Sequence, residues 1–343
     1  MSDYTLYPWQ AEPWRALTAN IAQLPHALLL TGAAGIGKRR FAERLAAMLL
    51  CESADRSVAP CGVCDGCRWF AAGNHPDFRV LAPQDADDEP AEDAKPAKKK
   101  SSLITVDDIR ELGDFVNLTA HRGGSRVTLV YPAEAMNTAA ANAFLKTLEE
   151  PPSGARFILV SHQWRRLLPT IRSRCRVFPL PTPAIEPAAH WLAGQGVVNP
   201  LLHLAHSGGA PLAALDDASA EWLPWRTKLL DALANPGGLD VIGLAAEYDR
   251  AKVEMTLIVD WLQKWVHDLV AFSMAGKVRY YPDRSEALAR LAPRAGELPR
   301  FAERLIDARR LATHPLNARL NIEALLYDYL AALKGATLKG ERR

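Results

Sequence analysis

The sequence lacks the features that would mark a membrane protein, a secreted protein or a strongly basic protein. It contains no run of about 18 apolar residues, so we expect no membrane-spanning helix. Its polar N-terminus has no apolar signal region, and the expected location is therefore the cytoplasm. The 343 residues carry a net charge of only +2, so we do not expect a strongly basic surface. Any contact with DNA must then come from a local patch or from a partner.

Cysteine is scarce, and most of it is concentrated in one short segment. Of the five cysteines, Cys175 stands alone and four form a cluster: Cys51, Cys61, Cys64 and Cys67. In a reducing cytoplasm such a cluster indicates a metal site before it indicates disulfides. Two Cys-x₂-Cys steps that share Cys64, with a fourth thiolate upstream, suit a tetrahedral zinc site. Four thiolates leave no place for water, so we expect a structural zinc module at about residues 51–75. Cys175 is expected to be a buried packing residue.

Strand and helix patterns alternate over the first half of the chain. Apolar runs bounded by turn residues predict strands at 27–31, 78–82, 127–131, 157–161 and 176–178. Helical spacing predicts a helix at 106–117, with Asp107 as its candidate cap, and another at 138–150. This alternation indicates a parallel sheet that is covered by helices on both faces.

The strand patterns stop near residue 181, and helical patterns replace them. Regular apolar spacing predicts helices at 253–272 and 322–333, so we expect this half of the chain to be all-helical. The segment 83–102 is rich in charge, alanine and proline and has almost nothing to bury. We therefore predict a disordered surface loop there.

A glycine-rich turn follows the first predicted strand and opens a helix. Its glycines are Gly32, Gly35 and Gly37, and Lys38 follows them. This is the context of a phosphate-binding loop, in which backbone N–H groups and the helix N-terminus face the anion and the lysine meets the terminal phosphates. We therefore predict an α/β P-loop NTPase domain. The sequence leaves open whether ATP or ADP still binds.

The two positions that hold magnesium in a working P-loop enzyme carry unsuitable residues. Arg39 stands where a serine or threonine hydroxyl should follow the lysine. The strand at 127–131 should end in an acidic pair, but it runs into Tyr131 and Pro132, and Glu134 comes too late. Because both magnesium supports are missing, we predict that the chain does not hydrolyse ATP by itself.

Two further motifs carry a family resemblance. One is AAANAFLKTLEEPP at residues 139–152, and the other is Ser-Arg-Cys at residues 173–175. With the glycine-rich loop, the cysteine cluster and the segment 317–330, they resemble the bacterial clamp-loader subunits of the AAA+ superfamily over almost the whole chain. The resemblance implies three domains: an AAA+ RecA-like domain at 1–182 with the inserted zinc module, a small helical lid at 183–218 and a helical collar at 219–343.

Within that family the sequence is more similar to the non-hydrolysing delta-prime type than to the gamma/tau motor. The missing magnesium residues favour this assignment, and Pro211 stands in a segment where the motor carries a phosphate-sensing arginine. In the family, the arginine of Ser-Arg-Cys reaches the ATP site of the neighbouring subunit. The resemblance thus implies that Arg174 is an arginine finger supplied in trans.

The implied function is that of a part of the DNA polymerase III holoenzyme with no enzyme activity of its own. Its partners would be the gamma/tau and delta clamp-loader subunits, the sliding clamp and, through the complex, primed DNA. Two alternatives are an active gamma/tau-like ATPase with unusual metal ligands and a stand-alone zinc protein that binds nucleic acid. The near-neutral net charge argues against the second alternative.

Overall fold

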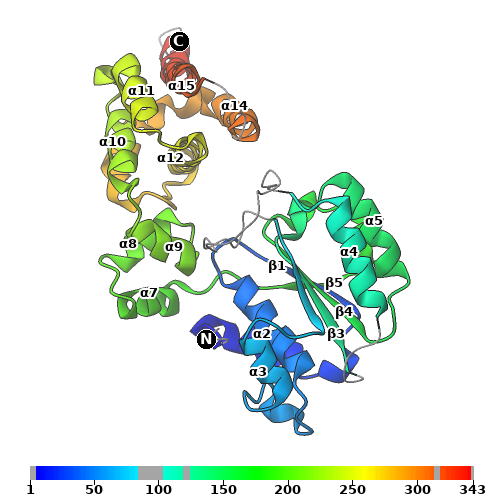
Figure 1. The fold of residues 1–343 in the computed structure, drawn as a ribbon. Coiled ribbons are helices and arrows are strands. Elements are labelled where there is room, and N and C mark those ends of the chain that lie inside the picture. Colours follow the sequence, from blue (N-terminus) through cyan, green and yellow to red (C-terminus); the bar gives the residue numbers. More distant parts are fainter. Residues whose placement is uncertain (1–4, 84–102, 119–123, 313–316, 341–343) are drawn as a thin grey trace. The chain divides into compact units, whose positions relative to one another are not determined.

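The computed structural model describes residues 5–83, 103–118, 124–312 and 317–340 (Figure 1). The chain forms two compact units, Met1–Pro187 and Ala188–Arg343. The predicted disordered loop lies outside the described residues except for Pro83. Among the described residues, no helix is both long enough and apolar enough to cross a membrane.

The first unit is built on a parallel sheet of five strands. In chain order these are β1 (Ala27–Thr31), β2 (Phe78–Leu81), β3 (Arg126–Val130), β4 (Ala155–Ser161) and β5 (Arg176–Pro179). Their order across the sheet is β2-β3-β4-β1-β5, and every neighbouring pair is parallel. The sequence prediction of a parallel α/β sheet is therefore confirmed, and each predicted strand is present within a residue or two of its expected ends.

Helices cover both faces of the sheet. Those of the first unit are α1 (Ala11–Thr18), α2 (Lys38–Leu50), α3 (Asp65–Ala71), α4 (Val106–Asn117), α5 (Thr138–Glu149) and α6 (Pro169–Arg174). Helix α2 lies on one face, and α4 and α5 lie together on the other (Figure 1). All five residues of β1 are buried because the strand lies inside the sheet, between β4 and β5. The segments that leave β1, β4 and β5 therefore meet at one edge, where ligands of such sheets usually bind.

The predicted cap of α4 is wrong. The cap is Thr105, whose Oγ1 accepts a hydrogen bond from the backbone N–H of Asp108 at 3.5 Å, while the Asp108 carboxylate accepts from the Thr105 N–H at 2.6 Å. Asp107 lies one residue inside the helix and pairs with Arg110 at the exposed surface. An N-cap residue needs extended backbone, which Thr105 has and which a residue already inside the helix lacks.

The chain after β5 is entirely helical where it is described. Its helices are α7 (Ile185–Gly194), α8 (Pro200–His206), α9 (Pro211–Ala218), α10 (Leu223–Ala234), α11 (Val241–Arg250), α12 (Met255–Ala275), α13 (Ser285–Leu291), α14 (Leu298–Leu311) and α15 (Ala318–Gly340). Both helices predicted from apolar spacing are present, as α12 and α15. The predicted helical C-terminal half is therefore confirmed.

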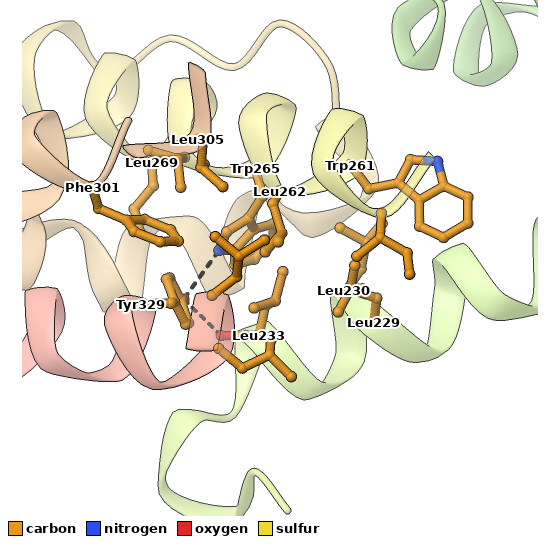
Figure 2. Close-up of a cluster of buried hydrophobic side chains, with 14 of the residues drawn as sticks. Leu229, Leu230, Leu233, Trp261, Leu262, Trp265, Leu269, Phe301, Leu305 and Tyr329 are labelled. Carbon is orange, nitrogen blue, oxygen red and sulfur yellow. Dashed lines mark hydrogen bonds between the residues drawn. The ribbon is translucent and has the colours of Figure 1, made fainter. Parts of the chain in front are cut away.

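Leucine and aromatic side chains from α10, α12, α14 and α15 form the core of the second unit (Figure 2). Trp265 is fully buried, and its indole N–H donates a hydrogen bond to the Tyr329 hydroxyl at 3.0 Å. That hydroxyl donates in turn to the carbonyl of Leu233 on α10 at 2.9 Å. One hydroxyl group thus satisfies polar groups of two other helices inside an apolar core, where unpaired polar groups are costly.

We expect Tyr329→Phe to lower the free energy of unfolding by about 1–3 kcal/mol, because it leaves the Trp265 N–H and the Leu233 carbonyl buried without partners. Tyr327→Phe on the same helix is the matched control. Tyr327 is 51 % exposed, so its loss of a hydroxyl should change stability by at most about 0.5 kcal/mol. Urea unfolding of the full chain, followed by tryptophan fluorescence, measures both. Equal stability of the two variants would contradict the role of this hydroxyl.

Candidate functional site

The glycine-rich loop lies at the carboxyl edge of the sheet and requires its glycines. Gly35 and Gly37 have φ of 75° and 83°, a region that side-chain-bearing residues rarely adopt. A Cβ atom at Gly37 would come within 2.5 Å of the Tyr7 ring, and one at Gly32 would come within 2.5 Å of the Leu180 carbonyl oxygen. The backbone of this loop is thus packed against both the N-terminal segment and the end of β5.

Lys38 opens α2 and is almost fully buried, with 2 % of its surface exposed. Its ammonium group donates to the carbonyl oxygens of Gly32 at 2.9 Å and Ala33 at 2.5 Å. It also lies 2.7 Å from Nδ1 of His162, the residue that follows β4. Burial lowers the pKa of Lys38 to about 8, and the nearby Glu134 carboxylate opposes that shift. The loop lysine therefore contacts groups of its own chain.

His162 and Glu134 are brought to this edge by strands that are distant in the sequence. Glu134 lies in the short turn Ala133–Ala135 after β3, and its Oε1 accepts hydrogen bonds from the backbone N–H groups of His162 at 2.8 Å and Gln163 at 3.1 Å. Burial is the main cause that lowers the pKa of His162, and the Lys38 charge lowers it further. Sequence reasoning missed His162, although its place directly after a strand of the predicted sheet was a usable signal.

The two positions that lack magnesium ligands contact each other. The guanidinium carbon of Arg39 lies 5.3 Å from the centre of the Tyr131 ring, within the range of a cation–π contact. The Nε of Arg39 also pairs with Glu43 at 2.9 Å, four residues along α2. A fixed cation and an aromatic ring thus meet beside the loop.

The N-terminal segment packs against the far end of the glycine-rich loop. The amide of Gln10 donates to the carbonyl of Gly37 at 2.8 Å, and the indole of Trp9 donates to the carbonyl of Ile36 at 3.0 Å. The rings of Tyr7 and Trp9 stack with their centres 4.9 Å apart. These contacts hold the backbone of the loop in place from outside.

Arg174 is the last residue of α6, and its side chain is 34 % exposed. It forms an ion pair with Glu149 at the end of α5 and donates a hydrogen bond to the Thr170 carbonyl at 3.0 Å. The neighbouring arginines differ from it: Arg172 lies over the Trp164 ring at 5.3 Å, and Arg176 lies on the exposed edge strand β5. Sequence reasoning did not identify Glu149 as the partner of Arg174.

The four clustered cysteines come together between α2 and α3. Their sulfur atoms all lie within 4.8 Å of one another, and the Cys51–Cys64 and Cys61–Cys67 sulfur pairs are each 4.0 Å apart. A disulfide requires about 2.05 Å, whereas tetrahedral zinc with bonds of about 2.3 Å places its ligands about 3.8 Å apart. The spacing fits a zinc site and does not fit a disulfide.

Backbone N–H groups support these sulfur atoms. The Cys64 N–H points to the Cys61 sulfur at 3.4 Å, and the Cys67 N–H points to the Cys64 sulfur, the cap of α3, at 3.4 Å. Hydrogen bonds from Val63 and Cys64 lower the pKa of Cys61 to about 6, while burial raises the pKa of Cys67. Cys175 lies apart in the core of the sheet, where burial raises its pKa to about 12. It is the buried packing residue that the sequence predicts.

A family model described as DNA polymerase III, delta subunit, matches residues 9–184. The DNA polymerase III subunit delta' of Pseudomonas aeruginosa is 36 % identical, covering 96 % of this chain and 98 % of its own length. The subunit of the same name from Escherichia coli is 35 % identical, covering 75 % of this chain and 76 % of its own length. The DNA polymerase III subunit tau of Salmonella typhimurium is 26 % identical, covering 91 % of this chain and 51 % of its own length.

Two solved structures match this chain with low identity and low TM-scores. A gamma subunit-related protein of DNA polymerase III from Thermotoga maritima is 18 % identical, covering 94 % of this chain and 99 % of its own, with a TM-score of 0.40. The clamp loader delta protein of Bacillus subtilis is 12 % identical, covering 93 % of this chain and 99 % of its own, with a TM-score of 0.33. The sequence relatives carry the assignment: this chain belongs to the delta' subunit family of DNA polymerase III.

Proposed function

We propose that this chain is the non-hydrolysing delta-prime subunit of a bacterial clamp loader. It acts with gamma/tau and delta subunits to place the sliding clamp on primed DNA. The observation that carries the proposal is the Arg39–Tyr131 contact beside the glycine-rich loop. Magnesium-assisted phosphoryl transfer needs a hydroxyl after the loop lysine and a carboxylate after the facing strand. A guanidinium over a phenol ring supplies neither and repels a divalent cation.

The remaining acid at this edge does not replace the missing ligands. Oε1 of Glu134 accepts two backbone N–H groups of the His162–Gln163 segment. Its Oε2 is buried and has no hydrogen-bond partner among the described residues, but one carboxylate oxygen beside the Lys38 charge does not replace a hydroxyl and an acidic pair. The chain therefore keeps the frame of an ATPase without its set of metal ligands.

Purified alone, the chain is expected to hydrolyse ATP no faster than its Lys38→Ala variant. Both rates should equal the background rate, because neither protein can hold magnesium at the transferred phosphate. Phosphate release with and without primed DNA measures this. Hydrolysis by the wild-type chain that disappears in Lys38→Ala would contradict the proposal.

The partly exposed Arg174 is proposed to serve the ATP site of a neighbouring subunit. Its ion pair with Glu149 is partly solvated, with side-chain exposures of 34 % and 48 %, and pairs of this kind contribute about 0–1 kcal/mol. A phosphate also accepts charge-assisted, bidentate hydrogen bonds from a guanidinium. The ion pair with Glu149 is therefore weak enough to be exchanged for the phosphate of a neighbour.

Arg174→Ala, assembled with the motor and delta subunits, is expected to slow ATP turnover at the adjacent site by about 10³–10⁵-fold. Arg176→Ala on the exposed strand β5 is the matched control and should leave turnover unchanged. Single-turnover ATP hydrolysis with clamp and primed DNA resolves that one site from the others. Identical rates for the two variants would exclude a finger role for Arg174.

The four clustered cysteines are proposed to hold a structural zinc ion. Cys51, Cys61, Cys64 and Cys67 would be its ligands, and the ion would supply folding free energy to a segment with few apolar residues. Structural zinc contributes on the order of 10–16 kcal/mol in small peptides. The small buried cluster of Met48, Ala59 and two of these cysteines is too small to fold the segment without such a contribution.

The chain purified without chelator is expected to contain one zinc ion, and the double variant Cys61→Ser, Cys64→Ser is expected to contain none. Cys175→Ser removes a more deeply buried thiol outside the cluster and should retain the ion. Elemental analysis measures the number of zinc ions per chain in the three proteins. Zinc in the double variant, or no zinc in the wild type, would contradict the assignment of this zinc site.

The two helical segments after the sheet are proposed to divide as the lid at 183–218 and the collar at 219–343. The lid would connect the AAA+ domain to the collar, and the collar would pack against its counterparts in the other subunits. Because this chain has no nucleotide cycle of its own, it would be a comparatively rigid reference in the assembly.

A further inference from the structure

We infer that the imidazole of His162 takes the place of a nucleotide phosphate at Lys38, so that the loop of this chain is completed internally and holds neither ATP nor ADP. The inference deepens the proposed non-hydrolysing function and rests on it. Loss of magnesium ligands explains why hydrolysis stops, but by itself it leaves nucleotide binding open. The contacts of Lys38 bear directly on nucleotide binding.

The hydrogen bonds of the Lys38 ammonium are fully used. An ammonium group has three protons and no acceptor. Its nitrogen lies 2.9 Å from the Gly32 oxygen, 2.5 Å from the Ala33 oxygen and 2.7 Å from His162 Nδ1. A phosphate could bind this lysine only by displacing one of the three acceptors. Two of these acceptors are backbone carbonyl groups of the loop, and the third is the side chain of His162.

The contact requires a neutral imidazole, and the surroundings favour that form. Nδ1 can accept from the lysine only when it carries no proton. Three groups face the imidazole: the Lys38 ammonium, the Glu134 carboxylate and the Tyr131 ring. The Tyr131 and His162 rings meet edge to face, with their centres 5.6 Å apart. Burial and the lysine charge oppose protonation of His162, and their combined effect exceeds that of the carboxylate.

His162 is held in position from its backbone. The Glu134 carboxylate accepts the N–H groups of His162 and Gln163 in succession, at 2.8 Å and 3.1 Å. The turn that carries Glu134 is anchored by its two buried neighbours, Ala133 and Ala135. The acceptor is thus aligned with the lysine before any ligand arrives, and a competing phosphate must disrupt an ordered network.

The neighbourhood leaves room for an anion once the imidazole is removed. A hollow of about 530 Å³ lies beside the loop, lined by residues that include Gly32, His162, Arg165 and Pro179. It opens next to the imidazole that contacts Lys38. Removal of that ring would free one ammonium proton and enlarge this space at the same point. The inference therefore predicts a gain of binding from a deletion, which a general loss of structure cannot produce.

Calorimetric titration of the full chain with ADP, without magnesium, tests this. Wild type is expected to show no binding at millimolar ADP, and His162→Ala is expected to bind at least tenfold more tightly. Addition of Lys38→Ala to that variant should abolish the gain. Gln163→Ala, the exposed neighbour that lines the same hollow, is the matched control and should gain nothing. A folded His162→Ala that binds no ADP, or a wild type that binds it as tightly as the variant, would overturn the inference.

A second measurement uses the wild-type chain and does not depend on the variant folding. The ¹H–¹⁵N correlation spectrum of histidine-labelled protein is expected to show His162 protonated at Nε2 only, with an Nδ1 signal that moves in Lys38→Met. A charged ring, or an Nδ1 signal that Lys38→Met leaves unchanged, would contradict the contact. ATP hydrolysis by the wild-type chain would refute the proposed function, whereas these outcomes refute only the role of His162.

Discussion

A buried ammonium group must find acceptors, and the architecture of the first unit is arranged around that requirement at Lys38. The lysine starts the helix that follows β1, and β1 lies between β4 and β5. Its acceptors come from the loop that precedes it and from the residue that follows a neighbouring strand. The loop offers two carbonyl oxygens, and β4 leads directly to an imidazole. The glycines, the Glu134 turn and the N-terminal segment all hold parts of this arrangement in position.

The same sheet edge carries the glycine-rich loop and the two positions where a working P-loop enzyme holds its metal. In this chain those positions are occupied by Arg39 and Tyr131, which form a cation–π pair. These two residues meet because parallel strands deliver the ends of β1 and β3 to one side of the sheet. Arg174 lies at the end of α6, where a partly solvated ion pair is its main contact. Lys38, which contacts groups of this chain, is 2 % exposed, whereas the side chain of Arg174, which is proposed to serve a neighbour, is 34 % exposed.

The sequence was informative wherever a local pattern determines the outcome. Buried strands appear as apolar runs because both faces of a parallel sheet are covered, and the helices at 253–272 and 322–333 appear as regular apolar spacing. The cysteine cluster could be predicted because its spacing is local. The cap of α4 was misassigned because Thr105 and Asp107 are both acceptable capping residues in composition, and only backbone geometry separates them. His162 and Glu149 were missed because their partners are 124 and 25 positions away, and pairwise contacts of that range leave no periodic trace in a single sequence.

The hydroxyl of Tyr329 also has a consequence for the timing of folding. It joins α15 to a carbonyl that lies 96 positions earlier on α10 and to the indole of α12, 64 positions earlier. During translation, the helices that precede α15 emerge with the apolar surface that α15 will cover still open to water. Domains fold as units as the chain leaves the ribosome, so this unit cannot complete its core until the last helix has been synthesised. A chain that is terminated before residue 329 would therefore have a complete sheet and an aggregation-prone helical half.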